Sequence, residues 1–253
     1  MSHELRTPLN AILGFAELLR LEMADQGVHT WDSDVQKIQR AGTHLLALIS
    51  DVMDSSKIEA GKIELQPECF DIAALLQEVA AGVQAIALKN AVELVVFCEP
   101  AMLYADRVRI EQCLFNLLGN ACKFTQDGRV TIDARPDRNT QPEGTSGAAW
   151  YNVRISDTGI GMRPEDLDKL FSYFTQLDGS NARKYGGSGL GLAISRKLAL
   201  LMGGDITVES ALGQGSTFTL RLPLGTAPLG TAPDERSGQN DAQPSPALYE
   251  NRS

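Results

Sequence analysis

The sequence predicts an α+β fold class, with a helical hairpin first and a mixed unit of helices and strands behind it. Two patterns predict this arrangement. Apolar residues recur at steps of three and four over residues 1–61, which is typical of helices in a bundle. Over residues 62–224, strand patterns are interleaved with helical ones. We therefore expect a hairpin domain at 1–61, a second domain at 62–224 and a disordered linker tail at 225–253, where Pro-rich, polar sequence cannot bury enough apolar surface.

The N-terminal hairpin is predicted from two heptad seams joined by a loop over residues 24–33. The seam positions are Leu5, Leu9, Ile12, Ala16, Leu19 and Met23, then Val35, Ile38, Gly42, Leu45, Ile49, Val52 and Ser56. Gly61 is suited to end the second helix because glycine tolerates the left-handed backbone there. A single hairpin has too little core, so we expect a homodimer whose two hairpins form a four-helix bundle.

The second unit is predicted element by element from its periodicity. We expect a strand over 62–70, a helix over 72–88 capped by Asp71, a buried strand over 92–98, a helix over 110–124, strands over 128–134 and 151–156, a helix over 190–202 and strands over 205–210 and 217–222. Residues 135–149 are rich in Pro, Gly, Thr and Asn, so we interpret them as a long surface hairpin loop. The folded region is expected to end near Leu224.

Composition and charge exclude several classes of function. The net charge of -9 argues against nucleic acid as a partner, because such binding needs an excess of Lys and Arg. The four cysteines are scattered without a metal-ligand spacing, so we expect reduced, buried thiols in a cytoplasmic protein. No apolar run approaches the roughly 20 residues that span a bilayer, and any membrane contact would come through a sensor region outside this chain.

Three polar side chains share one face of the helix predicted over 110–124. Asn116, Asn120 and Lys123 follow the spacing i, i+4 and i+7, while leucines occupy the other face. The amide oxygen of Asn120 can coordinate Mg²⁺, and Lys123 can offset phosphate charge. The alternative is an exposed polar stripe with no ligand.

Two glycine-containing stretches are suited to the same ligand, and together with the polar face of 116–123 they indicate a nucleotide site. Asp157 to Gly161 follows a strand, so its carboxylate can accept a hydrogen bond from an exocyclic amine while Gly159 and Gly161 let the backbone approach a flat ring. Asp-Thr-Gly is also the aspartic protease signature, which would require a second aspartate from a symmetric dimer. Residues 186–192 open a helix whose free N–H groups favour phosphate, unless they form a simple Gly-rich loop.

His3 is the candidate nucleophile. It falls at a b position, one past the seam, where an imidazole faces water and can reach a second domain. Glu4 beside it can take the proton from one ring nitrogen while the other attacks an electrophile. A solvated histidine without a role is the plain alternative.

The stretch His-Glu-Leu-Arg-Thr-Pro at residues 3–8 resembles the H-box of the sensor histidine kinases. Residues 116–125, 157–161, Phe171 with Phe174, and 186–192 resemble the N, G1, F and G2 boxes of that family, and 213–217 completes the pattern. The resemblance implies an α/β sandwich ATP-binding domain of the gyrase, chaperone and histidine-kinase type. It also implies a mobile lid over residues 175–187, in which Arg183 or Lys184 supplies the cation that some members carry where Gln176 stands.

The resemblance assigns roles residue by residue. It implies His3 as nucleophile, Glu4 as general base, Thr7 as the residue that orients water during dephosphorylation of a partner, and Asn120 as the Mg²⁺ ligand. The implied ATP-binding residues are Asn116, Asn120, Lys123, Phe124, Asp157, Gly159, Gly161, Phe174, Lys184, Gly187, Gly189, Leu190, Gly191 and Thr217.

The implied activity is Mg-ATP-dependent autophosphorylation of His3, followed by phosphotransfer to an aspartate of a response-regulator receiver domain. The tail resembles the linker of hybrid kinases, whose receiver domain is missing here. Two alternatives stay open: a nucleotide-binding dimerisation scaffold without turnover, and, more weakly supported, a dimeric aspartic protease.

Overall fold

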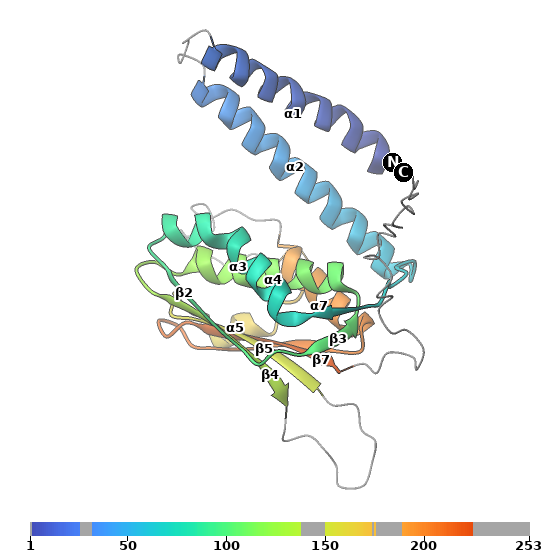
Figure 1. The fold of residues 1–253 in the computed structure, drawn as a ribbon, viewed down its shortest axis with the longest axis vertical. Coiled ribbons are helices and arrows are strands. Elements are labelled where there is room, and N and C mark those ends of the chain that lie inside the picture. Colours follow the sequence, from blue (N-terminus) through green and yellow to red (C-terminus); the bar gives the residue numbers. More distant parts are fainter. Residues whose placement is uncertain (1, 26–31, 138–149, 174, 176–188, 225–253) are drawn as a thin grey trace, which may run out of the picture.

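The structure, a computed structural model, describes residues 2–25, 32–137, 150–173, 175 and 189–224 (Figure 1). The side chains of residues 2–8, 44 and several others in the first two helices lie outside this description. The helices are α1 (Ser2–Asp25), α2 (Asp32–Glu59), α3 (Ile72–Lys89), α4 (Arg107–Phe124), α5 (Pro164–Leu167) and α7 (Gly191–Leu201). The strands are β1 (Glu68–Asp71), β2 (Glu93–Cys98), β3 (Met102–Ala105), β4 (Arg129–Asp137), β5 (Trp150–Asp157), β6 (Asp205–Ser210) and β7 (Ser216–Pro223).

Helices α1 and α2 pack against each other as the predicted hairpin (Figure 1). Alternate seam positions point into the hairpin and are buried: Leu9, Ala16, Val35 and Gly42. The seam positions between them remain 46–52% exposed: Ile12, Leu19, Ile38, Leu45 and Val52. Removing apolar side chains from water lowers the free energy of the protein, so this exposed half of the seam favours packing against another surface.

The second helix ends as the sequence predicts. Gly61 has a φ of 62°, a left-handed conformation that glycine adopts without a steric penalty. The N–H of Lys62 donates to the carbonyl of Lys57 at 2.9 Å, and the N–H of Gly61 donates to that of Ile58 at 3.0 Å. This pair of bonds satisfies carbonyls that the helix end would otherwise leave unpaired, and it turns the chain into the second unit.

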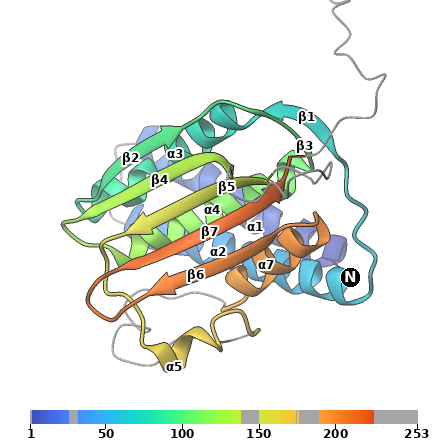
Figure 2. The same cartoon turned by 90° about the horizontal axis from the view of Figure 1, so that it is seen from below.

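A five-stranded sheet organises the second unit, in the order β2-β4-β5-β7-β6 (Figure 2). Strands β2 and β4 are parallel, and the other neighbours are antiparallel. Helices α3, α4 and α7 cover one face of the sheet, and β1 pairs with β3 in a separate antiparallel ribbon. This layer of helices on a mixed sheet confirms the predicted α/β sandwich.

The core lies between that sheet and its helices. Along β4 the residues Val130, Ile132 and Ala134 point to the helices and are buried, as period-2 alternation requires. Leu117 and Leu118 of α4 are completely buried against them. The opposite face of the sheet carries no helix layer among the described elements, so side chains there reach solvent (Figure 2).

Several sequence expectations for the second unit were wrong. The strand expected over 92–98 forms as β2, but it lies at the edge of the sheet and Phe97 is 59% exposed. We expected a buried strand because a β-branched run looks the same in sequence at the edge and in the centre of a sheet. Of residues 62–70, only the last three join β1, and its partner β3 was not predicted. All four thiols are free, yet Cys69 is exposed and Cys98 is half-buried, so only two of them are buried as expected.

Helix α3 is long and apolar enough to cross a membrane by length and composition, which the sequence analysis did not anticipate. Its face toward the sheet is buried in the core of the second unit, at Ile72, Leu75, Leu76, Val79, Val83 and Ala87. Asp71 caps its first turn by accepting the N–H of Ala73 at 2.9 Å, as predicted. The packing of α3 is therefore that of a core helix.

Helix α2 also packs against α7 of the second unit and is hydrogen-bonded to α4. Asp54 of α2 accepts hydrogen bonds from Arg109 at 3.3 Å and from Gln112 at 3.1 Å, both on α4. Arg109 donates in turn to Gln112 at 2.9 Å. The Asp54 and Arg109 side chains are only 17% and 24% exposed, so this cluster is a partly buried polar link between hairpin and sandwich.

Candidate nucleotide site

The polar stripe of α4 forms the floor of the candidate site. Asn116, Asn120 and Lys123 are all half-buried, while Leu117 and Leu118 on the other face are fully buried. Burial lowers the pKa of Lys123, because desolvation disfavours its charged form. An ammonium held partly out of water in this way gains when a negatively charged ligand approaches.

A tight turn after β5 packs on the C-terminal end of the same helix. The Ile160 N–H donates to the carbonyl of Phe124 at 3.4 Å, and a Cβ on Gly159 would lie only 2.5 Å from that oxygen. Gly161 has a φ of 61°, and a Cβ there would approach the Ala211 carbonyl oxygen to 1.9 Å. Neighbouring backbone therefore requires glycine at both positions, and the approach of this turn to a flat ring stays a prediction from the sequence.

Asp157 begins this turn and has a perturbed pKa. Its Oδ1 accepts the Gly159 N–H at 2.8 Å. Burial raises the pKa of Asp157, and the backbone N–H groups of Gly159 and Ser216 partly offset that rise. A partly desolvated carboxylate with spare lone pairs favours a ligand that donates N–H groups to it.

The first turn of α7 closes the other side of the stripe. Gly191 lies against Asn116, because a Cβ at position 191 would lie 2.5 Å from the Asn116 Oδ1. Gly189 has a φ of 68°, so the chain enters α7 through a left-handed residue, and Leu190 is buried beneath it. The N-terminal end of a helix favours an anion, which is the role predicted for Gly189 and Gly191.

The chemistry of these side chains fits Mg²⁺ held together with nucleotide phosphates. Among the described residues, the Oδ1 of Asn120 accepts no hydrogen bond, while its Nδ2 donates to the Asn116 Oδ1 at 3.4 Å. No group of three or more His, Cys, Asp or Glu side chains in the described ranges could hold a metal by itself. A single side-chain oxygen beside phosphates and water is the environment that Mg²⁺ favours.

The structure does not bring Thr217 to this site. Ser216 is the residue directly opposite Asp157 in the β5–β7 pair, so those two side chains share the face toward the helices. The Thr217 hydroxyl instead pairs with that of Ser156 at 2.9 Å on the other face. The hydroxyl that shares a face with Asp157 is therefore that of Ser216, because a shift of one residue along a strand reverses the face. A role for Thr217 in ATP binding stays a prediction from the sequence.

Several predicted site residues lie outside the described structure. Phe174, Lys184 and Gly187 belong to the segment predicted as the F box, lid and start of the G2 box, and the tail 225–253 is also outside. His3, Glu4 and Thr7 lie on α1, and their side chains are not described. Their roles remain predictions from the sequence.

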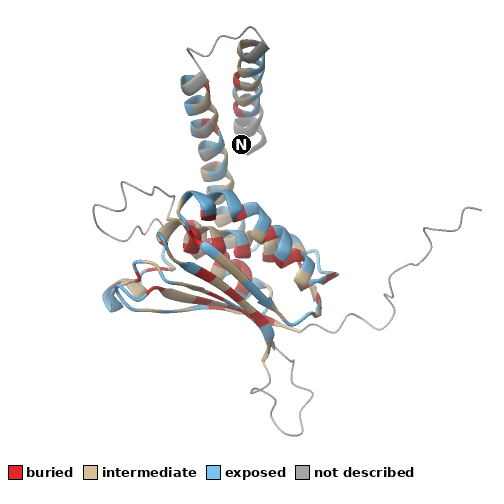
Figure 3. Ribbon diagram, turned by 60° about the vertical axis from the view of Figure 1, so that its left-hand side comes forward, coloured by how far each residue is buried: buried red, intermediate tan, exposed pale blue. Residues whose placement is uncertain are grey.

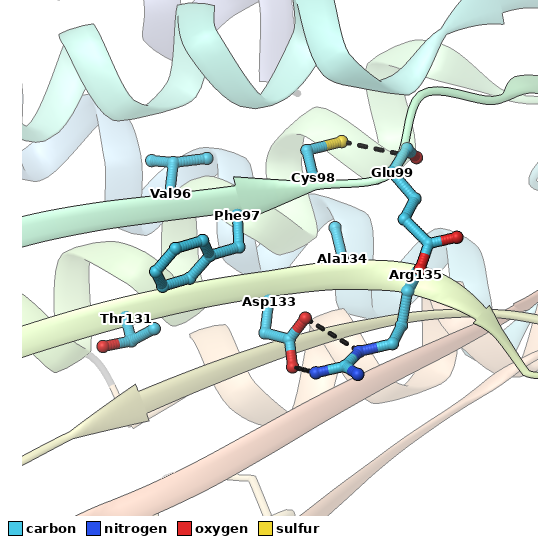
Figure 4. A pocket seen from close by; sticks show the side chains of 8 residues that line it. All are labelled: Val96, Phe97, Cys98, Glu99, Thr131, Asp133, Ala134 and Arg135. Atoms are coloured by element: carbon cyan, nitrogen blue, oxygen red, sulfur yellow. Dashed lines mark hydrogen bonds and ion pairs between the residues drawn. The ribbon is translucent and has the colours of Figure 1, made fainter.

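A hollow among the described residues lies elsewhere, along β2 and β4 at the edge of the sheet (Figure 4). Phe97, Thr131, Asp133 and Arg135 line it from the face opposite the helices, and Arg135 forms an ion pair with Asp133. It shares no residue with the stripe on α4, so shape alone does not identify the nucleotide site. The residues of α4, the turn at 157–161 and the start of α7 identify it by their chemistry.

Fold and site together define a nucleotide-binding α/β sandwich joined to a helical hairpin. Two domain families match the chain in the same order: "His Kinase A (phospho-acceptor) domain" over residues 1–61 and "Histidine kinase-, DNA gyrase B-, and HSP90-like ATPase" over residues 105–226. The chain belongs to the histidine kinase family and comprises its kinase core. The resemblance inferred from the sequence motifs is thereby confirmed.

Individual relatives agree with this assignment. Hybrid signal transduction histidine kinase B of Dictyostelium discoideum is 38% identical over 89% of this chain, and the match covers 11% of that protein. The autoinducer 2 sensor kinase/phosphatase LuxQ of Vibrio parahaemolyticus is 39% identical over 88% of this chain and 26% of its own length. The chain thus spans about a quarter or less of these two curated relatives.

Solved structures also match most of the chain. Full-length ShkA in complex with AMPPNP superposes with a TM-score of 0.70 and 34% identity, covering 89% of this chain and 45% of that one. The comparisons give no support to the aspartic protease or to a scaffold without turnover.

Proposed function

We propose that this chain is an ATP:protein-histidine phosphotransferase that phosphorylates His3 and passes the phosphoryl group to an aspartate of a receiver domain. The observation that carries the proposal is the combination of the polar stripe on α4 with the half-buried Asp157, in a chain that also contains the phospho-acceptor hairpin. The relatives named as hybrid kinases support a receiver domain as the partner and favour a hybrid kinase as the parent protein.

In the proposed reaction, one ring nitrogen of His3 attacks the γ-phosphorus of ATP in line with the bond to ADP. An N–P bond forms as the P–O bond breaks, ADP leaves with that electron pair, and Glu4 takes the proton from the other ring nitrogen. When the protein instead dephosphorylates its partner, Thr7 would orient the attacking water. The protein contributes mainly positioning and charge, since phosphoryl transfer needs little other covalent chemistry.

The nucleotide is expected to lie on the α4 stripe. Asp157 would accept a hydrogen bond from the adenine amine, and Asn120 would hold Mg²⁺, which screens the charge of the phosphates. Lys123 and the N–H groups at the start of α7 favour the same phosphates. Phe174, Lys184 and Gly187 would complete the site from the segment between Tyr173 and Gly189.

We also propose a homodimer in the cytoplasm. The exposed half of the hairpin seam supports the dimer, because a second copy would bury the five side chains Ile12, Leu19, Ile38, Leu45 and Val52. Free cysteines support a reducing compartment.

The test is incubation with γ-labelled ATP and Mg²⁺, followed by measurement of protein-bound label. We expect label that is stable to alkali and lost in acid, absent from His3→Ala and retained by the matched control His44→Ala. Asn120→Ala should lose Mg²⁺-dependent nucleotide binding but keep the dimer. Label that persists in His3→Ala would overturn the assignment of the nucleophile, and nucleotide binding without any label would favour the scaffold.

A further inference from the structure

Ser195 is a buried polar residue without a role in the site described so far. It lies in α7, is 2% exposed and is one of three buried polar side chains among the described residues, with Asp106 and Thr125. Its neighbours Ile194 and Leu198 belong to the core. Burying a hydroxyl among apolar side chains costs free energy of folding unless the hydroxyl is hydrogen-bonded. The hydrogen-bond partner of Ser195 therefore indicates its role.

That partner is the side chain of Asn116 on α4. The Asn116 Nδ2 donates to the Ser195 Oγ at 2.9 Å, which joins the two helices through a partly buried polar contact. Gly191 lies one turn before Ser195 on the same face of α7, and its missing side chain leaves the space that the Asn116 amide occupies. Gly191 and Ser195 thus form a notch that holds the amide in one place.

In the structure, the contact goes with one orientation of the Asn116 amide. Because its nitrogen donates to Ser195, its oxygen must point away from Ser195, where it accepts the Nδ2 of Asn120 at 3.4 Å. Asn120 in turn keeps its own oxygen for a ligand. A bound cation needs the Asn120 oxygen, so Asn120 then donates to the Asn116 oxygen, and the Asn116 NH₂ needs an acceptor on its other side. The Ser195 hydroxyl supplies that acceptor, and an alanine at position 195 would leave the NH₂ unsatisfied in the arrangement that binds the metal.

We propose that Ser195 is a positioning residue, which acts through Asn116 to hold Asn120 with its amide oxygen toward the Mg²⁺ of bound Mg-ATP. The proposal rests on the proposed function, and it revises the role expected for Asn116 from contact with nucleotide to orientation of Asn120. The first turn of α7, which offers N–H groups to phosphate, is therefore linked by hydrogen bonds to the metal ligand on α4.

The experiment measures ATP affinity by calorimetry on the full chain, once with Mg²⁺ and once with a chelator. The ratio of the two affinities isolates the contribution of the metal. In Ser195→Ala we expect this ratio to fall about five- to ten-fold, the amount that one lost hydrogen bond supports. The affinity for metal-free ATP and the thermal midpoint should change little. Ser195→Thr, which keeps the hydroxyl, should restore most of the ratio.

Ser156→Ala is the matched control, because it removes a serine hydroxyl from the same domain on the opposite face of the sheet. It should leave the ratio unchanged. Equal losses with and without Mg²⁺ in Ser195→Ala would show a merely structural role and overturn the proposal, as would an unchanged ratio. If Ser195→Ala does not fold, Asn116→Ala must show the same metal-specific loss, and a normal ratio there would overturn the proposal. A parent chain that binds ATP without any effect of Mg²⁺ would refute the metal assignment instead.

Discussion

The hairpin and the sandwich bury their apolar residues in different ways (Figure 3). In the sandwich, α4 and the sheet enclose side chains such as Leu118 and Ile132 completely. In the hairpin, only every second seam position is buried, and Leu45 is still 48% exposed. The sandwich therefore completes its core within one chain, whereas the hairpin leaves half of its core to be supplied by another surface.

We expect the largest difference between the two units when a leucine is truncated in each of them. Leu118→Ala should cost about 2–5 kcal/mol of unfolding free energy, because it leaves a cavity in a closed core. Leu45→Ala should cost less than about 1 kcal/mol at concentrations where the chain is monomeric. Denaturant unfolding of both variants over a range of protein concentrations provides the measurement. Equal costs at low concentration would contradict the contrast between the two units.

A charge placed on the exposed seam should break the hairpin's association and leave the sandwich intact. Ile38→Asp is expected to weaken dimerisation at least ten-fold, which corresponds to about 1.4 kcal/mol, because an unpaired carboxylate would enter an apolar interface. ATP affinity should remain at the parent's value. Sedimentation velocity across a dilution series measures the first effect and calorimetry the second. An unchanged dimer would mean that the seam is not the interface.

Loss of the link between the units should have a smaller effect. Asp54→Ala removes the acceptor for Arg109 and Gln112 in a partly buried cluster, and about 1–2 kcal/mol of coupling should disappear. The loss of coupling would be measured as faster hydrogen exchange near the end of α2 and in α4. The control Asp34→Ala breaks an exposed pair with Lys37 and should change exchange very little. If the two variants behave alike, Asp54 does not hold the units together.

The smallest effect concerns the pH dependence of the sandwich alone. Because the pKa of Asp157 is raised in the folded state, the folded state binds more protons than the unfolded state above the ordinary aspartate pKa of about 4. Stability should therefore fall as pH rises from that value through the raised pKa. Asp157→Asn should remove this slope and slightly raise the thermal midpoint at neutral pH, while ATP binding is lost. A steeper dependence of stability on pH in Asp157→Asn would contradict the raised pKa assigned to Asp157.

The sequence alone predicted the features that depend on nearby residues. The cap at Asp71, the helix end at Gly61 and the polar stripe of Asn116, Asn120 and Lys123 each follow from spacing within one or two turns. The tight turn at Gly159 and Gly161 was also expected, although the sequence linked it to a ligand ring and the structure shows close contacts with the backbone of Phe124 and Ala211. These signals are local, so they survive in the linear chain.

Only the tertiary structure decided the features that depend on residues far apart in the chain. Whether β2 lies at an edge, and which of Ser216 and Thr217 faces Asp157, depends on strand pairing between distant segments. Ser195 reads as an ordinary helix residue until α7 packs on α4 and its hydroxyl meets Asn116, 79 residues away. The contacts of Asp54 with α4 arise in the same way. Periodicity predicts which face of an element is apolar, but the neighbour that covers this face is chosen by the packing of the whole fold.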